Sequence, residues 1–399
     1  MNTVSPESVG FSSARLKRVD QVMQKYVDQG KLPGVLSLVA RRGQVAHLSK
    51  VGWMDVEAQK PIAFDTLFRI YSMTKPLTSV AVMMLYEEGH FFLSDPVAKY
   101  IPEFEDVKVF VRKTETGVEL DNLKRPLTIH HLLTHTGGLS YGFDENDYVD
   151  KQIQNRVWRH HHDNPDITLE EFVHRIAMCP LRTQPGTEFY YSLSIDVLGY
   201  LVQVVSGQPF DAFLQERILG PLGMVDTAFD VPESKLDRFA VNYTPDKEKK
   251  GLDVLDAPET SRYAKPTRCP AGGMGLVSTL GDYYRFAQML CNKGELDGQR
   301  LLGRKTVELM RSNHLRDGVC RDGNPALGFG LGFGVTLDAE RTQTLESVGT
   351  YGWGGAATTR FEIDPQEELV HIEMTQLMDN DSVPVLDEMQ VAIYQAIVD

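Results

Sequence analysis

The stretch that most constrains the fold of this chain is the apolar run from Leu77 to Leu85, within SMTKPLTSVAVMMLYEEG. Few polar residues interrupt the run and Gly89 follows it, so the pattern predicts a helix that is buried on most of its sides. The chain has 399 residues, 42% of them hydrophobic, which is enough to bury a substantial core. This length suits one large domain or two of ordinary size.

The segments near the two ends of the chain predict mixed α and β structure. Ser12 and Ser13 offer an N-cap for a helix over 16–27, and VLSLVARRGQVAHLSKVGW predicts a hairpin around the turn RRGQ. Beyond residue 270, successive antiparallel strands are predicted for GFGLGFGVTL, ESVGTYGWGG, TTRFEID and ELVHIEMTQ, followed by a helix in LDEMQVAIYQAIVD. We therefore predict a discontinuous α/β domain over 1–85 and 265–399, interrupted by a mostly helical insertion over 86–264.

An S-x-x-K motif, Ser72-Met73-Thr74-Lys75, lies where the buried helix begins. The backbone N–H of Ser72 belongs to the unsatisfied first turn, and Lys75 lies three residues on, on the same face. A buried lysine can lose its charge and accept the proton of a serine nucleophile. The motif alone is weak, because an N-cap serine beside a solvated lysine has the same pattern.

A second serine motif, GLSYG at 138–142, matches the G-x-S-x-G of a nucleophile elbow. That elbow needs a strand before the serine and a helix after it. Here a helical pattern, LTIHHLLTHTGGL, precedes Ser140 and a polar turn follows it. We interpret Ser140 as a residue of a loop that follows a helix, and not as a nucleophile.

Three stretches, RIYSMTKPLTS, QPGTEFYYSLSIDVLGYLVQVVSG and GTYGWGGAATTRFEIDP, occur in this order. With LTIHHLLTHTGGLSY and PAGGMGLVSTLGDYYRF, they make nearly the whole chain resemble the serine β-lactamase and penicillin-binding-protein superfamily. The resemblance lies on the class C branch and is strongest to the family VIII carboxylesterases. It implies a β-lactamase/transpeptidase-like fold, in which helices flank an antiparallel sheet beside a mostly helical subdomain.

The resemblance also implies roles for individual residues. Ser72 matches the acylated nucleophile and Lys75 its partner. Tyr191 matches the tyrosine of the second motif, a general base whose phenolate a neighbouring cationic lysine would stabilise. The adjacent Tyr190 is a less suitable match, because the tyrosine of the motif is the one followed by serine.

The third motif of the family, K-T-G in the lactamases, corresponds to Trp353-Gly354-Gly355. The backbone N–H groups of Ser72 and Ala356 would form the oxyanion hole. Aromatic residues within 141–158 and 351–353, Tyr141 and Trp353 among them, could line an acyl pocket, although core packing is the default interpretation of such residues.

Two departures from the lactamase pattern bear on the substrate. Leu193 stands where the second motif has asparagine, and Trp353 stands where the third has lysine. Both changes remove polar contacts to a β-lactam and its carboxylate. The sequence thus predicts a serine hydrolase that cleaves short-chain esters through an acyl-enzyme, with no cofactor. A β-lactamase, a D-amino-acid amidase or peptidase, an acyltransferase, or a binding protein without turnover are the alternatives.

The histidines of the chain predict no metal site. His160, His161 and His162 are consecutive and do not converge on one face, so we interpret them as part of a solvated lid loop. His131 and His135 have an i,i+4 spacing, but no glutamate follows His131 as a zinc motif requires. We interpret this pair, and the neighbouring His130, as packing residues.

Charge and composition exclude several classes of partner. The net charge of −14 argues against nucleic acid and against anionic membranes. No run of 18 apolar residues exists, and the N-terminal segment lacks the apolar core of a secretory signal, which predicts a cytoplasmic protein. The four cysteines show no metal or redox spacing. The expected partner is a small-molecule ester, and the sequence leaves the oligomeric state open.

Overall fold

The centre of the molecule is an eight-stranded sheet in which every neighbouring pair of strands is antiparallel. It is seen in a computed structural model that describes residues 1–246, 251–378 and 383–399. Across the sheet the strands are β12 (Leu327–Phe329), β13 (Gly334–Thr336), β14 (Tyr351–Gly355), β15 (Thr359–Asp364), β16 (Leu369–Met374), β1 (Gly34–Arg41), β2 (Gln44–Asp55) and β3 (Lys60–Pro61).

The predicted N-terminal hairpin is confirmed as β1 and β2. Its two-residue turn has positive φ at both Arg42 (53°) and Gly43 (72°), the backbone of a tight hairpin turn that matches strand twist. On its other side β1 pairs with β16, so the hairpin joins the C-terminal strands. The α and β segments predicted near the two ends of the chain therefore build one sheet.

Helices cover both faces of this sheet. Alternate residues of β1 point to opposite faces: Leu36 and Leu38 enter the core cluster that contains α2 and α9, whereas Val35 and Val39 pack with α1 and α12. The helices are α1 (Ser13–Asp28), α2 (Thr74–Glu87), α3 (Ile129–Leu133), α4 (Tyr148–Ile153), α5 (Arg159–Asp163), α6 (Leu169–Ala177), α7 (Ser194–Ser206), α8 (Phe210–Leu214), α9 (Leu280–Cys291), α10 (Arg304–Met310), α11 (Ala339–Thr342) and α12 (Val385–Tyr394).

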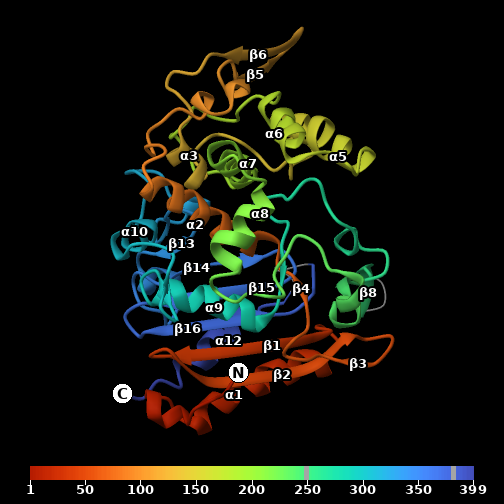
Figure 1. Cartoon of the computed structure of the whole chain (residues 1–399), viewed down its shortest axis with the longest axis vertical. Coiled ribbons are helices and arrows are strands. Elements are labelled where there is room, and N and C mark those ends of the chain that lie inside the picture. The colour runs from red at the N-terminus through yellow and green to blue at the C-terminus, as the bar shows by residue number, and fades with distance from the viewer. Residues whose placement is uncertain (247–250, 379–382) are drawn as a thin grey trace.

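The buried helix predicted from the apolar run is confirmed as α2. Every residue from Thr74 to Leu85 is buried, because α7 and α8 pack against this helix as well as the sheet side of the core. Figure 1 shows α3, α6 and α7 gathered beyond α2, at the end of the molecule far from both termini. Among the described residues, no helix combines the length and the apolar character needed to cross a membrane.

The segment from 148 to 163 is helical, which corrects the predicted lid loop. In the histidine run His162 is exposed, as predicted, whereas His161 packs on Phe172. α4 continues through one π-helical turn (Gln154–Trp158) into α5. Val149, Ile153 and Val157 recur every four residues and are buried, so they form an apolar stripe that holds this helix on the core. Polar residues between them hid the stripe in the sequence.

Short two-stranded ladders complete the fold. They are β4 (Phe68–Arg69) with β9 (Val277–Ser278), β5 (Val109–Thr114) with β6 (Gly117–Asp121), β7 (Asn242–Pro245) with β8 (Leu252–Asp256), and β10 (Glu295–Leu296) with β11 (Gln299–Arg300). The helix-rich middle of the chain carries two of these ladders. The division into domains at residues 85 and 265 stays a prediction.

Candidate active site

Ser72 lies in a single 3₁₀ turn (Tyr71–Met73) that leads directly into α2. Its hydroxyl does not cap the helix, since the N-cap of α2 is Met73 and no side chain caps it. Tyr71 has a φ of +42°, a strained conformation for a bulky residue and one that concentrates at functional sites. The ordinary alternative, a capping serine beside a solvated lysine, is therefore not what the structure shows.

Lys75 is only 1% exposed, and its ammonium donates three hydrogen bonds. Nζ lies 3.1 Å from Ser72 Oγ, 2.9 Å from the Tyr141 hydroxyl and 2.6 Å from the carbonyl oxygen of Gly273. Three acceptors match the three donors of an ammonium group. All three donor positions of the Lys75 side chain are thus used by acceptors, one of which is Ser72 Oγ.

Two tyrosine rings stack beside this lysine. The ring centroids of Tyr141 and Tyr191 are 5.3 Å apart, and Lys75 Nζ lies 4.7 Å from the centroid of Tyr191. The Tyr191 hydroxyl accepts a hydrogen bond from Trp353 Nε1 at 3.3 Å. Burial, with the nearby Asp196, raises the pKa of Tyr141 well above 10, so that phenol stays protonated.

Asp196 is a member of this cluster that sequence reasoning missed. It lies on α7, is fully buried, and accepts a hydrogen bond from the backbone N–H of Gly273 at 2.9 Å. Burial raises the pKa of Asp196 to about 6, against the opposing attraction of Lys75. Its signal was visible in SIDVLGYLV, because an aspartate within an apolar helix needs a polar partner.

Strand β14 brings the third motif beside Ser72. A side chain at Gly355 would clash with the carbonyl oxygen of Ile70, so glycine is required for this strand to approach the turn that carries the serine. In the described part of the chain, the backbone N–H groups of Ser72 and Ala356 donate to no protein acceptor. Both residues line the same cavity, where two free N–H donors could hold an oxyanion.

The cavity over Ser72 has a volume of about 780 Å³, and half of its described lining residues are aromatic. The described residues that line it include no charged side chain; they are Tyr71, Ser72, Tyr141, Phe143, Gln154, Trp158, Tyr191, Met274, Trp353, Gly354, Gly355 and Ala356. Most predicted site residues thus come together here.

Leu193 differs from the other predicted site residues. It is fully buried at the start of α7 and does not line the cavity. Tyr190 lies elsewhere too, with its ring 4.4 Å from the guanidinium of Arg182. Sequence reasoning did not single out Gln154 and Met274, which belong to the wall.

Ser140 is buried away from the cavity and is held by hydrogen bonds within the protein. Its side chain is 1% exposed, donates to the carboxylate of Asp150 and accepts the backbone N–H of Gly142 at 3.0 Å. The histidines interpreted as packing residues also have structural partners: His131 completes the capping box of α3 by accepting the backbone N–H of Thr128, and the buried His135 forms a hydrogen bond with Ser192. Within the described residues, no three potential ligand side chains converge as a metal ion would require.

Comparisons with known proteins extend over nearly the whole chain. A family model described as Beta-lactamase matches residues 19–396. Protein Rv1367c of Mycobacterium tuberculosis (strain ATCC 25618 / H37Rv) is 35% identical over 364 residues, which cover 89% of this chain and 88% of that protein. Esterase EstB of Burkholderia gladioli is 32% identical over 374 residues, which cover 88% of each chain. The solved structure of EstCE1, described as a hydrolase with promiscuous acyltransferase activity, superposes with a TM-score of 0.78 at 28% identity, covering 96% of this chain and 99% of that one.

Proposed function

This chain belongs to the Beta-lactamase family and is a serine hydrolase of the β-lactamase/transpeptidase-like fold, and from that premise we propose that it is a carboxylesterase that cleaves short-chain esters through an acyl-enzyme. The observation that carries the proposal is the Lys75–Ser72 hydrogen bond at the floor of an aromatic cavity. The names of two relatives, Esterase EstB and the hydrolase EstCE1, support the same reaction class.

In the proposed first step, Ser72 Oγ attacks the ester carbonyl carbon and gives its proton to Tyr191. Lys75 is saturated by three acceptors, and the raised pKa of Tyr141 keeps that phenol protonated, so Tyr191 is the group left to act as base. The backbone N–H groups of Ser72 and Ala356 hold the oxyanion of the tetrahedral intermediate. Lys75 holds the phenolate of Tyr191 in place through its charge, 4.7 Å from the ring.

Collapse of the tetrahedral intermediate breaks the ester C–O bond, and Tyr191 returns the proton to the departing alkoxide. Ser72 is then acylated. A water molecule, deprotonated by Tyr191, attacks the acyl carbon, and a second collapse releases the acid and restores the serine hydroxyl. Each step uses one base and one oxyanion hole.

The cavity wall favours a neutral ester over a β-lactam. A β-lactam carries a carboxylate beside its reactive amide, and the described lining offers that carboxylate no cation. An unpaired carboxylate in an apolar groove costs several kcal/mol. The indole of Trp353 offers the alkyl or aryl part of an ester a flat apolar surface instead.

The test compares two substrates on one preparation, p-nitrophenyl butyrate and a chromogenic cephalosporin. We expect kcat/KM to favour the ester by at least about 100-fold. A cephalosporin value equal to or above the ester value would make this protein a β-lactamase.

Labelling with a fluorophosphonate, followed by peptide mass spectrometry, separates a catalyst from a binding protein. We expect one adduct, on Ser72, with Ser140→Ala still labelled. An unlabelled wild-type protein would point to binding without turnover, and an adduct on Ser140 would overturn the assignment of the nucleophile.

A further inference from the structure

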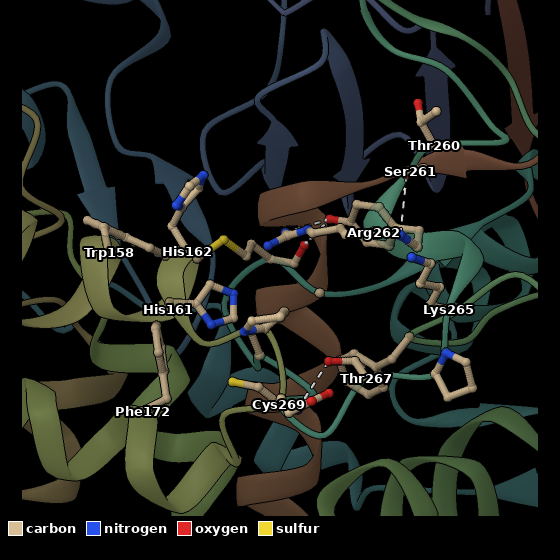
Figure 2. A pocket seen from close by; sticks show the side chains of 18 residues that line it. Trp158, His161, His162, Phe172, Thr260, Ser261, Arg262, Lys265, Thr267 and Cys269 are labelled. Carbon is tan, nitrogen blue, oxygen red and sulfur yellow. Dashed lines mark hydrogen bonds between the residues drawn. The ribbon is translucent and has the colours of Figure 1, made fainter.

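A second cavity, of about 570 Å³, adjoins the one over Ser72. The two share Trp158 and Met274 as walls. Figure 2 shows Trp158, His161, His162 and Phe172 on the helical side of this cavity, with the segment from Thr260 to Cys269 on the other side. A substrate that fills the first cavity therefore has a second compartment within reach.

This second cavity carries charged side chains, unlike the first. Two cations, Arg262 and Lys265, and one carboxylate, Asp166, belong to its described lining, which gives it an excess of one positive charge. The whole chain carries a net charge of −14, so a local excess of positive charge is not the consequence of composition. This positive charge favours an anionic ligand group in the second cavity.

Arg262 has no counter-ion among the described residues: it forms no ion pair with a carboxylate, whereas the buried Arg69 pairs with Asp256 at 2.6 Å. Its one described hydrogen bond runs from Nη2 to the Tyr263 hydroxyl, at 3.0 Å. A guanidinium has five N–H donors, so most of its donors are left for a ligand.

Its neighbours connect Arg262 to the nucleophile. Tyr263 donates to the carbonyl oxygen of Met274 at 3.2 Å and meets the ring of Tyr71 edge-on, with centroids 6.5 Å apart. Tyr71 precedes Ser72 and lines the first cavity. Two aromatic side chains thus separate the guanidinium from the residue that would be acylated.

His161 adds a hydrogen-bonding group to the same compartment. Burial and the charge of Arg262 lower the pKa of His161, which keeps the ring neutral. Its Nδ1 is buried, and among the described atoms it has no hydrogen-bond partner. A ligand in this cavity could supply that partner.

We propose that the second cavity is a recognition subsite for a free carboxylate at the end of the substrate remote from the scissile ester, with Arg262 as its anchor. The planar fork of a guanidinium fits a carboxylate in a bidentate manner, which a lysine cannot reproduce. The substrate class is then the monoester of a dicarboxylic acid, or the ester of a hydroxy acid, according to whether the acyl or the alcohol part enters the subsite. This inference rests on the proposed esterase function.

The test measures kcat/KM for two matched pairs of esters. In the acyl arm, mono-p-nitrophenyl adipate is compared with its neutral methyl ester; in the alcohol arm, 4-acetoxybenzoate is compared with methyl 4-acetoxybenzoate. In one arm we expect Arg262→Gln to lower the ratio of anionic to neutral substrate by about tenfold or more. Arg268→Gln, an exposed arginine of the same segment that does not line the cavity, should leave the ratio unchanged.

A binding measurement keeps the subsite testable without turnover. Free adipate should raise the melting temperature of the wild type and of Arg268→Gln, but not that of Arg262→Gln. If Arg262→Gln does not fold, Arg262→Lys takes its place, and we expect it to lose most of the effect because the fork is gone.

Two failures are distinguishable. If neither neutral ester is hydrolysed, the esterase function fails and the adipate shift alone decides the subsite. If the neutral esters are hydrolysed but neither ratio depends on Arg262, or adipate stabilises wild type and Arg262→Gln equally, the subsite is refuted.

Discussion

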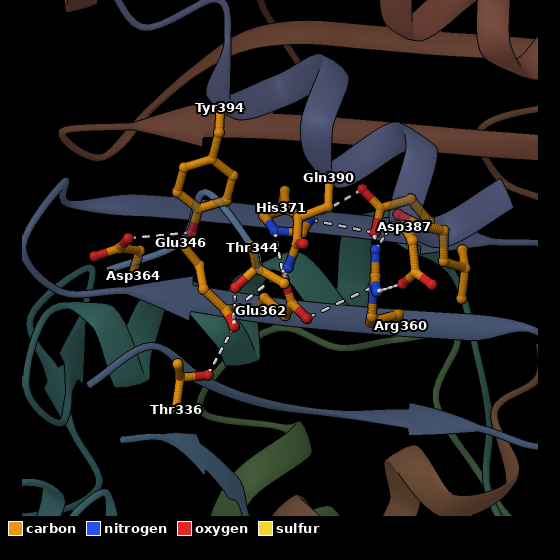
Figure 3. Close-up of polar contacts among 12 residues, drawn as sticks. Thr336, Thr344, Glu346, Arg360, Glu362, Asp364, His371, Asp387, Gln390 and Tyr394 are labelled. Carbon is orange, nitrogen blue, oxygen red and sulfur yellow. Dashed lines mark hydrogen bonds and ion pairs between the residues drawn. The ribbon is translucent and has the colours of Figure 1, made fainter. Parts of the chain in front are cut away.

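Two of the regions that bury titratable side chains lie at the start of α2 and between the sheet and α12. In the second region, His371 on β16 lies 2.9 Å from Glu362 on the neighbouring strand and 3.1 Å from Glu373. Gln390 of α12 donates to Glu362 at 2.8 Å, and Figure 3 shows these groups facing one another across the two strands and the helix. The charges of this network are matched.

In the cluster around Ser72 and Lys75, not every polar group has a partner within the described part of the protein. Ser72 Oγ faces a cavity of about 780 Å³, and one carboxylate oxygen of Asp196 has no hydrogen-bond partner among the described atoms. A cavity of about 280 Å³ also borders the network, but the carboxylates of Glu346 and Glu362 that line it already have partners. Buried polar atoms without a hydrogen bond occur in both regions, since Arg360 Nε and His371 Nε2 of the network also form none among the described atoms. What distinguishes the candidate active site is a serine hydroxyl that faces the larger cavity beside a lysine.

The two regions should differ most in how a substitution changes ester turnover, and the largest loss is expected at the proposed nucleophile. Ser72→Ala should lower ester turnover by about 1000-fold or more, because the covalent route disappears. Glu362→Gln, in the network, should leave turnover per folded molecule unchanged. Initial rates with p-nitrophenyl butyrate, normalised to folded protein by circular dichroism, give both values. A large loss of turnover in folded Glu362→Gln would mean that the network takes part in catalysis.

A change in the network should cost stability in place of activity. Removal of one partner from a buried ion pair leaves the other charge uncompensated, so His371→Gln should lower the free energy of unfolding by about 3 kcal/mol. Burial alone would lower the pKa of His371, but Glu373 and Glu362 raise it from 6.5 to about 10. The contribution of a raised pKa is complete below pH 6.5 and is lost as pH rises through about 10.

Urea unfolding at a series of pH values checks this prediction. The difference in unfolding free energy between wild type and His371→Gln should be largest near pH 6 and should vanish above about pH 10. A difference that stays constant over this range would show that His371 contributes by packing and not by its charge.

Within the candidate active site, Tyr141 and Tyr191 should differ in how much their substitution lowers kcat. Tyr191→Phe should lower kcat by about 100-fold, since it removes the proposed base. Tyr141→Phe removes one acceptor of Lys75 and should cost about tenfold. Steady-state kinetics on both variants, with melting temperatures as the control for folding, test the assignment. The reverse order of the two losses would make Tyr141 the base.

The sequence predicted the parts of the site that are local in the chain. Ser72 and Lys75 lie three residues apart on one helical turn, so their contact follows from helix geometry. Tyr141 and Gly273 bond this lysine from distant segments, and Asp196 bonds Gly273 from a third; the spacing of these residues in the sequence does not predict that they meet. The family resemblance, which the comparisons confirm, supplied Tyr191 and the third motif.

For the fold, too, the sequence predicted the elements that have a strong local pattern and missed those that depend on tertiary packing. Strands with strong alternation or apolar runs, such as the hairpin of β1 and β2, were predicted from sequence alone. The helical segment 148–163 was not, because polar residues separate Val149, Ile153 and Val157, and the burial of these three residues depends on tertiary packing. The cavity beside His161 was hidden for the same reason.

The smallest expected difference between the two regions concerns Asp196 and Glu362. Neutral substitutions at these two positions should change the free energy of unfolding in opposite directions. Burial, the largest influence on both, disfavours the ionised carboxylate, and at Asp196 it prevails over the attraction of Lys75, so the pKa of Asp196 rises from 3.8 to about 6. At Glu362, Arg360 and His371 outweigh burial and lower the pKa. Since a raised pKa contributes stability below pH 3.8 that is lost as pH rises through about 6, ionised Asp196 destabilises the fold at neutral pH.

A permanently neutral side chain at position 196 avoids that loss. Asp196→Asn should therefore raise the free energy of unfolding at pH 7 by on the order of 2 kcal/mol, with no gain below about pH 4. Glu362→Gln should lower the same quantity at pH 7. Urea titrations of the two variants and the wild type at both pH values give the signs directly. A loss of stability in Asp196→Asn at pH 7 would mean that the ionised carboxylate supports the fold, as the network carboxylates do, and that the lysine beside Ser72 is held by a matched pair after all.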